Sequence, residues 1–126
     1  VPEFGWYHMT VTPEGQADPV LSVLKREFHS FEWHQDSFTL PEGSVHLAEN
    51  AATKSQCFRI GRASYGMQFH FEADRPMVED WTRRFPDTLE RIRPGWLRDH
   101  PKLAAELGPE ADAAGLAIAR AWVSLI

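Results

Sequence analysis

Hydrophobic and polar residues alternate without a break between Tyr65 and Glu72. Because successive side chains of an extended strand point to opposite faces, this alternation predicts a strand with one apolar and one polar face. The apolar face, which is expected to pack against a core, consists of Tyr65, Met67, Phe69 and Phe71. The polar face consists of Gln68, His70 and Glu72. The segment therefore combines a packing surface with a row of side chains that can carry chemistry.

Residues 1–73 have the pattern of a β-rich unit. The predicted strands, which alternate or are short and apolar, are residues 6–11, 28–38 and 45–48 and a hairpin over residues 58–72 that turns near Gly61. Residues 12–15 have the chemistry of a turn, and residues 19–26 have apolar positions spaced for one or two helical turns.

Residues 74–126 have helical patterns. Asp74 is predicted as the N-cap of a helix that ends at Pro86. Its apolar face is expected to comprise Met77, Val78, Trp81 and Phe85. From Asp87 onward, recurring Pro and Gly predict two or three short helices. The last of them begins near Pro109, and its apolar stripe, which is expected to face the core, is formed by Leu116, Ala119, Val123 and Ile126.

Composition narrows the classes of partner. The 126 residues are 43% hydrophobic, which is enough for the core of one domain. The 13 basic and 18 acidic side chains give a net charge of −5 without a basic patch, so no nucleic acid partner is expected. No apolar run is long enough to cross a bilayer, so no membrane partner is expected either. A single cysteine excludes an internal disulfide and is typical of a reducing compartment, which favours a cytoplasmic location.

His70 and Glu72 are the first candidates for catalysis. A carboxylate two positions away on the same strand face can hold the tautomer and charge of the imidazole, as the third group of a catalytic triad does. The alternative is a structural histidine on a half-buried strand. His34 and Asp36 have the same spacing, and here the alternative is a turn in which Asp36 caps backbone amides. No close set of His and Cys has the spacing of a zinc site, so no metal is expected.

Cys57 is the only cysteine and therefore the candidate nucleophile of a Cys-His hydrolase. It lies in the strand-like run of residues 56–60, without the glycine-flanked turn or helix N-terminus that lowers the pKa of a thiol and exposes the sulfur. Free cysteines are among the most buried residues, so we expect a packed, inert thiol. The chain thus offers a base without a nucleophile.

Four segments resemble class I glutamine amidotransferases. Residues 68–72, Gln-Phe-His-Phe-Glu, resemble the Gln-Phe-His-Pro-Glu signature of that family. The other three, in the family's order, are Glu-Phe-Gly-Trp at residues 3–6, Trp-His-Gln-Asp-Ser-Phe at residues 33–38, and Leu47-Ala48 followed by Gln-Cys-Phe-Arg-Ile-Gly at residues 56–61. The match is closest to stand-alone members similar to the glutaminase part of guanosine monophosphate synthase.

The resemblance implies an α/β fold of the flavodoxin-like, doubly wound, three-layer type. Residues 1–126 would be the C-terminal portion of that domain, with the sheet and hairpin in residues 1–73 and the closing helices in residues 74–126. His70 and Glu72 would belong to a Cys-His-Glu triad, whose cysteine lies on a preceding Gly-x-Cys-x-Gly elbow that this sequence does not contain. The substrate would be glutamine, with no cofactor, and ammonia would pass to an acceptor or synthetase partner that the sequence does not identify.

The resemblance also places His34, Asp36 and Gln68 in the neighbourhood of the substrate site. Two positions depart from the family pattern, because Phe71 replaces a proline and Gln35 replaces a glycine. Phe71 belongs to the apolar face and should leave His70 and Glu72 in place, whereas Gln35 affects the neighbouring loop.

Two other functions remain open at this stage. One is a γ-glutamyl hydrolase of the same fold, with water as the final acceptor. The other is a binding or regulatory module that keeps the scaffold without the nucleophile. In either case half of a sheet would expose an apolar face and an unpaired edge, so the chain is expected to self-associate.

Overall fold

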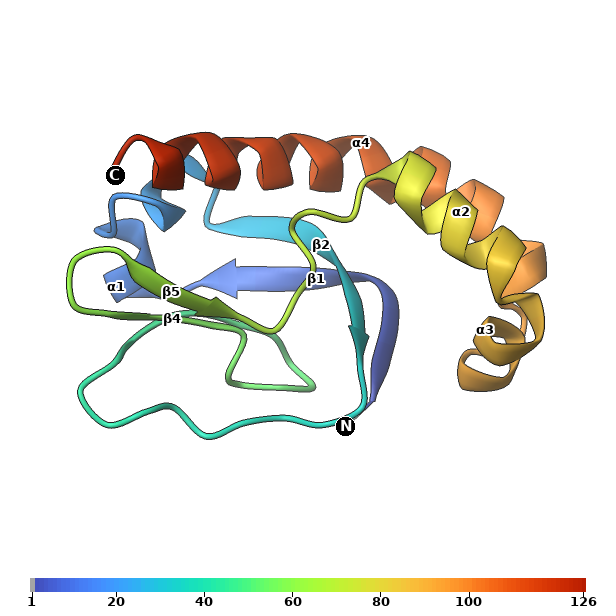
Figure 1. Cartoon of the computed structure of the whole chain (residues 1–126), viewed down its shortest axis with the longest axis horizontal. Helices are drawn as coiled ribbons and strands as arrows, with labels where there is room; N and C mark the ends of the chain where they lie inside the picture. The colour runs from blue at the N-terminus through green and yellow to red at the C-terminus, as the bar shows by residue number, and fades with distance from the viewer. Residues whose placement is uncertain (1) are drawn as a thin grey trace.

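The computed structural model describes residues 2–126 as a curled antiparallel sheet followed by a long helix (Figure 1). The strands are β1 (Glu3–Val11), β2 (Glu27–His34), β3 (Val45–Glu49), β4 (Cys57–Ile60) and β5 (Ser64–Met67). The helices are α1 (Pro13–Gln16), a 3-10 turn (Leu21–Val23), α2 (Arg75–Arg84), α3 (Pro86–Ile92) and α4 (Trp96–Val123). The strand order in the sheet is β2-β1-β3-β4-β5.

The strand predictions are confirmed with altered bounds: β1 begins earlier than predicted, at Glu3, and β3 extends to Glu49. The β4–β5 hairpin turns through residues 61–63, as expected, and Gly61 adopts the positive φ of 63° that its turn requires. The predicted strand over residues 28–38 ends at His34, and the one through Glu72 ends at Met67. The turn at residues 12–15 closes into α1, because the Thr12 side chain accepts a hydrogen bond from the amide of Gly15.

The segment after β5 leaves its neighbour β4 and crosses to the opposite edge of the sheet. The amide of His70 donates to the carbonyl oxygen of Phe31 in β2 at 2.8 Å, which forms an isolated antiparallel bridge. Because β2 and β5 are the two edges, this contact curls the sheet toward a closed shape. The predicted strand through Glu72 is therefore confirmed only as far as β5 and the single bridge at His70, because residues 71–72 form a turn.

Every pairing between neighbouring strands in the described sheet is antiparallel. The expectation that these residues supply strands of a parallel, doubly wound sheet is therefore corrected for this part of the chain. The connections from β3 to β4 and from β4 to β5 are too short for a parallel pair, which needs a crossover of a dozen or more residues. What the structure shows is a curled five-stranded antiparallel sheet with the long helix α4 along one side (Figure 1).

Helix α2 forms as predicted. The Asp74 carboxylate accepts a hydrogen bond from the amide of Met77 at 3.0 Å, which is the N-cap contact expected of this residue. Val78 is buried on the inner face, but Phe85 is 46% exposed. Phe85 differs from the expectation because it lies beyond the last helical residue, with φ −128° and ψ 48°.

The predicted series of short helices is wrong beyond Ile92. Residues 96–123 form the single helix α4, which continues through Pro101 and Pro109 and changes direction where it passes behind α2 (Figure 1). Each proline removes one backbone donor, and bending accommodates this loss while the helix stays packed. The expected apolar stripe is also wrong, since Leu116, Val123 and Ile126 are exposed.

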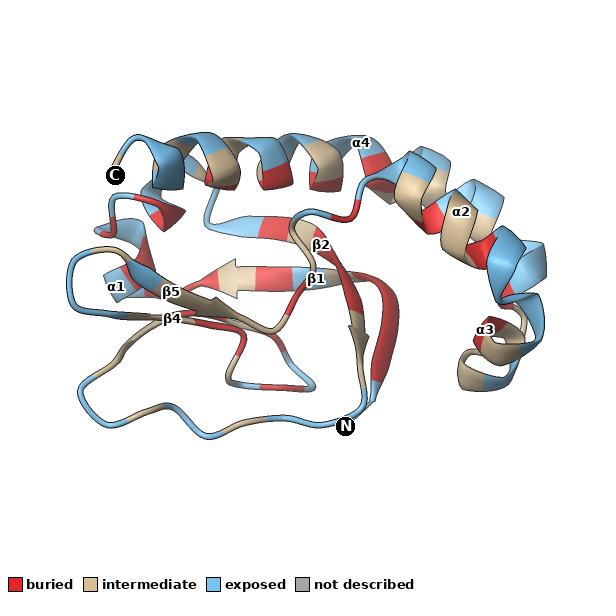
Figure 2. Ribbon diagram, viewed as in Figure 1, coloured by how far each residue is buried: buried red, intermediate tan, exposed pale blue. Residues whose placement is uncertain are grey.

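Three small residues, together with Trp96 and Ile118, form the actual inner face of α4. Its buried positions are Trp96, Gly108, Ala111, Gly115 and Ile118. Along the C-terminal half of the helix, the buried stretches face the sheet (Figure 2). A Cβ atom added to Gly115 would lie 2.1 Å from the carbonyl oxygen of Phe71. The helix backbone therefore approaches the segment that follows β5 more closely than any larger side chain would allow.

Two hydrophobic cores lie under α4. The sheet core comprises Met9, Val11, Val20, Leu21, Phe28, Leu47, Ala48, Cys57, Phe69 and Ile118. The aromatic core comprises Phe4, Trp6, Phe31, Ala73, Val78, Leu89, Trp96 and Ala111. Its centre is the fully buried Trp96, whose ring lies edge-on to Phe4 at 4.7 Å and stacks on Trp6 at 5.8 Å. None of the helices in residues 2–126 combines the length and the hydrophobicity that crossing a bilayer requires.

Candidate functional site

His70 and Glu72 are in direct contact. Nδ1 of His70 lies 2.7 Å from Oε1 of Glu72, and the two side chains are 35% and 51% exposed. The backbone of His70 is fixed from both sides, since its amide donates to Phe31 and its carbonyl oxygen accepts from Ala73 at 3.2 Å. The pair that the alternation predicted is thus assembled on a fixed backbone at an accessible surface.

The second nitrogen of the His70 ring faces the end of β2. Nε2 lies 3.3 Å from the carbonyl oxygen of Trp33, which is at the long end of the range for a hydrogen bond. The edge of the ring is also turned toward Trp81, with the ring centres 6.1 Å apart. When Glu72 accepts the Nδ1 proton, the lone pair of a neutral ring is on Nε2, and this is the atom that would act as a base.

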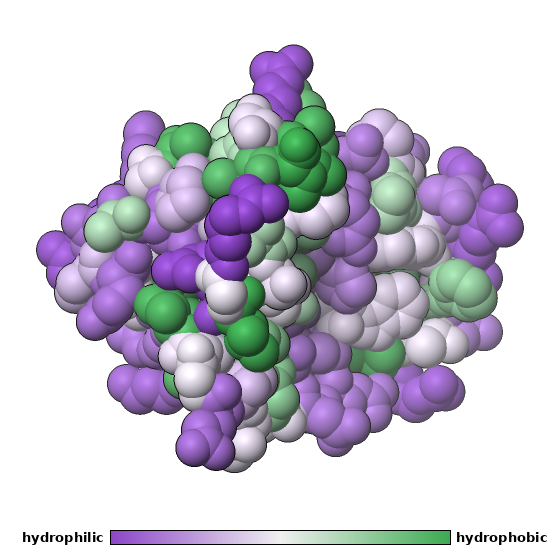
Figure 3. All heavy atoms as spheres, turned by 60° about the vertical axis from the view of Figure 1, so that its left-hand side comes forward, coloured by the Kyte–Doolittle hydropathy of each residue, from purple (hydrophilic) through white to green (hydrophobic). Residues whose placement is uncertain are grey.

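An open groove borders this pair. It has a volume of about 820 Å³ and lies between residues 63–72 and the C-terminal turns of α4. Its apolar wall includes Met67, Phe71, Ile118, Ala119 and Val123, while His70 and Glu72 stand on its polar side. Figure 3 brings this end of the molecule forward and shows hydrophobic patches among polar side chains. The candidate pair therefore opens onto a hydrophobic surface.

The other predicted site residues meet at one backbone atom. Nδ1 of His34 lies 2.9 Å from the carbonyl oxygen of Asp36, and the Gln68 side-chain amide donates to the same oxygen at 2.5 Å. Both sequence interpretations gave the role to the Asp36 carboxylate, but the contact with His34 uses the backbone carbonyl. His34, Asp36 and Gln68 are thus brought together, and Gln68 precedes His70 by two positions in the sequence.

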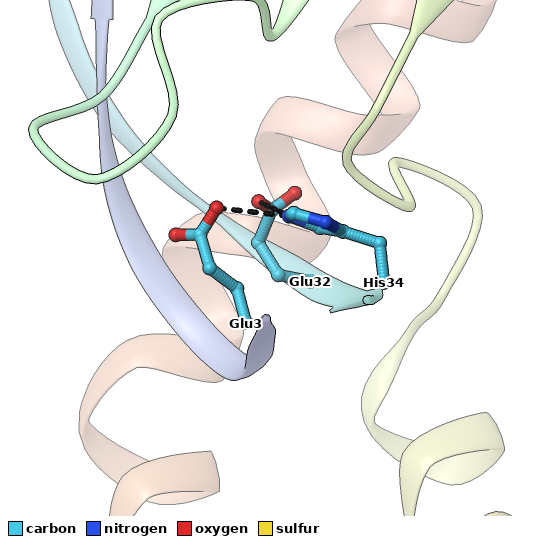
Figure 4. A group of neighbouring side chains, drawn as sticks. All are labelled: Glu3, Glu32 and His34. Carbon is cyan, nitrogen blue, oxygen red and sulfur yellow. Dashed lines mark hydrogen bonds and ion pairs between the residues drawn. The ribbon is translucent and has the colours of Figure 1, made fainter. Parts of the chain in front are cut away.

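His34 also belongs to a buried polar cluster that the sequence did not predict. The cluster consists of Glu3, Glu32, His34 and Gln56 and is hereafter the carboxyl cluster; Figure 4 shows its three ionisable members. Nε2 of His34 lies 2.9 Å from Oε1 of Glu3 and 3.1 Å from Oε2 of Glu32. The Gln56 amide donates to the same two oxygens at 3.2 and 3.1 Å.

The two carboxyls of this cluster have opposite pKa shifts. Burial, together with the hydrogen bond and the charge of Glu3, raises the pKa of Glu32 to about 9. Burial also acts to raise the pKa of Glu3, but hydrogen bonds with Glu32, His34 and Asn50 outweigh it, so the pKa of Glu3 is lowered. A signal was present in the sequence, because Glu32 and His34 alternate with the apolar Phe31 and Trp33 along β2.

The cluster also has the composition of a metal site. Its ionisable members offer one nitrogen and two oxygen ligands that lie within 4.8 Å of one another. However, these oxygens already accept hydrogen bonds from Gln56, and Nε2 of His34 lies within hydrogen-bond distance of both. The three atoms that would bind a metal are already engaged in hydrogen bonds with one another or with Gln56, so we assign no metal to the cluster.

Comparison with solved structures shows which proteins share this fold. A glutamine amidotransferase from Thermotoga maritima superposes with a TM-score of 0.79 at 22% identity, over 98% of this chain and 50% of that one. The chain has the fold of part of a glutamine amidotransferase. A glutamine amidotransferase from Methylobacillus flagellatus matches with a TM-score of 0.74 at 19% identity. The match covers 99% of the present chain and 53% of the Methylobacillus protein.

A third similar structure is described as a putative GMP synthase component from Thermoplasma acidophilum. Its TM-score is 0.62 at 20% identity, over 99% of this chain and 44% of that one. No protein-family model and no curated protein matches the sequence. The chain spans about half the length of the glutamine amidotransferases that it resembles in structure. At about 20% sequence identity, this structural likeness establishes the fold of the chain.

Within this glutamine amidotransferase fold, Cys57 lies in the sheet core. Its side chain is fully buried at the start of β4. Burial, with a contribution from the charge of Asp18, raises the pKa of the thiol to about 12. The prediction of a packed thiol is confirmed, and the sulfur has neither the exposure nor the ionisation of a nucleophile.

Proposed function

We propose that the chain is the C-terminal portion of a class I glutamine amidotransferase that hydrolyses the side-chain amide of glutamine. The observation that carries this proposal is the 2.7 Å contact between His70 and Glu72 beside an open groove. The fold shared with glutamine amidotransferases and the four resembling sequence segments support the same conclusion.

The proposed mechanism gives each residue one role. Nε2 of His70 takes the proton of a cysteine thiol, and the thiolate attacks the amide carbon of glutamine. The same nitrogen then returns the proton to the departing ammonia, which leaves a γ-glutamyl thioester for hydrolysis. Glu72 orients the ring through Nδ1 and stabilises the imidazolium formed in both steps. The released ammonia would pass to an acceptor that is still to be identified.

We place the nucleophile in a part of the protein that precedes these residues. Cys57 is buried with a raised pKa, so it cannot supply the thiolate. The preceding part would carry the cysteine on a strand-to-helix elbow, supply the parallel strands of a doubly wound sheet, and bring the thiol to His70 along the groove. A cytoplasmic location belongs to the same proposal, because a catalytic thiol requires reducing conditions.

The test compares the chain alone with the longer polypeptide. Residues 1–126 are expected to release no ammonia from glutamine, because a histidine-glutamate pair without a nucleophile forms no thioester. The longer polypeptide should release ammonia and accumulate a γ-glutamyl adduct, which intact-mass measurement detects. Cys57→Ser should leave that activity unchanged. Glutaminase activity of residues 1–126 that disappears in Cys57→Ser would refute the assignment.

We also propose that the isolated chain self-associates through the exposed side of α4. Leu116 and Val123 are 52% and 60% exposed; Val123 lines the groove beside the edge strand β5, and Leu116 lines the adjoining hollow next to Phe71 and Glu72. Sedimentation at micromolar concentration should show a dimer or a larger species. The double variant Leu116→Glu, Val123→Glu should be monomeric, whereas Leu97→Glu at the other end of the same helix should associate like the wild type. A monomeric wild type would contradict the proposal.

A further inference from the structure

The carboxyl cluster holds two buried carboxyl groups and one histidine, so its charges must be balanced internally. The side chains of Glu3 and Glu32 are 1% and 0% exposed, and that of His34 is 9% exposed. Two buried carboxylates beside a single imidazole would leave one negative charge uncompensated, which is costly in a dry environment. One of the carboxyls must therefore carry a proton.

The hydrogen bonds of His34 show where a positive charge lies. Nδ1 faces the carbonyl oxygen of Asp36, which can only accept, at 2.9 Å. Nε2 faces the oxygens of Glu3 and Glu32, both of which also accept a proton of the Gln56 amide. A ring that donates from both nitrogens is an imidazolium, since a neutral ring has only one N–H group.

The donors are distributed unequally between the two carboxyls. Both oxygens of Glu3 are bonded, Oε1 to His34 and Gln56 and Oε2 to the Asn50 amide at 2.7 Å. Oε2 of Glu32 also accepts from His34 and Gln56, but Oε1 of Glu32 is buried and has no hydrogen-bond partner among the described residues. A carboxylate with both oxygens satisfied is stable as an anion, whereas a buried oxygen without a partner costs a charged carboxylate more than a neutral carboxyl.

We infer that Glu32 is a buried neutral carboxylic acid, and that Glu3 and a charged His34 form an ion pair that positions the segment leading to His70. His34 is a positioning residue in this scheme. Its Nδ1–H fixes the carbonyl oxygen of Asp36, which in turn receives the Gln68 side chain. The backbone amide of Gln68 also donates to the carbonyl oxygen of Gln56, at 2.8 Å.

The relevance of this scheme to catalysis rests on the proposed function, but the proton assignment does not. Glu32 and His34 lie on β2, whose carbonyl oxygens at Phe31 and Trp33 face the amide and the ring of His70. Displacing the end of β2 would therefore move His70, whether or not the chain takes part in an enzyme.

The pH dependence of stability distinguishes the two carboxyls. The groups that contact the Glu32 carboxyl are Glu3, His34 and the neutral amide of Gln56. The folded pKa of Glu32 is raised, so its stabilising contribution is fully present below about pH 4.5 and is lost as the pH rises toward 9. The folded pKa of Glu3 is lowered, so its contribution is present above pH 4.5 and is lost in acid.

The test is a matched pair of isosteric variants of the 126-residue chain. Glu32→Gln replaces a neutral acid by a neutral amide, so the Tm should rise relative to the wild type by roughly 3 °C at pH 8 and by less at pH 5.5. Glu3→Gln removes the anion of a buried ion pair, so the Tm should fall by roughly 10 °C at pH 7. Equal losses in both variants would overturn the assignment.

Nitrogen NMR of the imidazole groups provides the second readout. His34 should have both ring nitrogens protonated at pH 7 in the wild type and in Glu32→Gln, but not in Glu3→Gln. The Gln68 side-chain amide and the His70 backbone amide should shift only in Glu3→Gln. A neutral His34 ring in the wild type would refute the ion pair, as would a stoichiometric Zn²⁺ complex that removes its N–H signals. Neither result depends on glutaminase activity, so failure here leaves the proposed function standing.

Discussion

Replacing His70 by alanine in the longer polypeptide is expected to reduce glutaminase turnover by about 10³-fold or more. The imidazole takes the thiol proton and later delivers it to ammonia, so its removal affects two successive steps. The γ-glutamyl adduct should no longer form, which a mass shift on mixing with glutamine would reveal. The Tm should change little, because the side chain of His70 is 35% exposed.

The controls separate chemistry from folding. His8→Ala removes a histidine that is 49% exposed and pairs with Glu27 on the surface, and it should leave turnover unchanged. Glu72→Gln should cause a smaller loss than His70→Ala, with a lower kcat and an altered pH profile, because the ring keeps its position but loses the partner that stabilises its charge. Full turnover in His70→Ala would remove the histidine-glutamate pair from the mechanism.

Gly115→Val is expected to destabilise the fold by roughly 3 kcal/mol. A Cβ atom at this position would lie 2.1 Å from the carbonyl oxygen of Phe71, and backbone cannot rotate away as a flexible side chain does. Either α4 or the segment between His70 and Glu72 must move. Urea denaturation would measure the loss of stability, and the amide signals of His70 and Glu72 would report the displacement.

Ala113→Val is the matched control for this substitution. It introduces a β-branched residue on the exposed face of the same helix, so it tests the helix propensity of valine alone. Its cost should stay below about 1 kcal/mol, and the signals of His70 should not shift. If the two variants were equally stable, the close approach of α4 to Phe71 would not be a constraint on the fold.

Local chemistry allowed much of the fold to be predicted. The hairpin around Gly61, the cap at Asp74 and the His70–Glu72 pair depend on residues that are close in sequence, so their patterns are complete within a few positions. The helix α4 was mispredicted because proline was given the weight that it has in an isolated helix. Packing against two cores outweighs the lost hydrogen bonds.

The part of the site that could not be predicted depends on distant residues. Glu3, Glu32 and Gln56 come from three separate strands or their flanks, and only their meeting around His34 shows that a proton must be shared. The role of Asp36 was misassigned for a related reason. Sequence patterns describe side chains, whereas its contacts with His34 and Gln68 use the backbone carbonyl.

Helix α4 joins the two cores, and this determines how the molecule unfolds. Its 28 residues span about 42 Å, with Ala111 in the aromatic core and Ile118 in the sheet core, two turns apart. Neither core can lose its helix without uncovering the other, so both should open in one cooperative transition. Amide hydrogens of β1 and of α4 near Ala111 and Ile118 should then exchange with the same free energy, which makes α4 the element that turns two packed regions into a single folding unit.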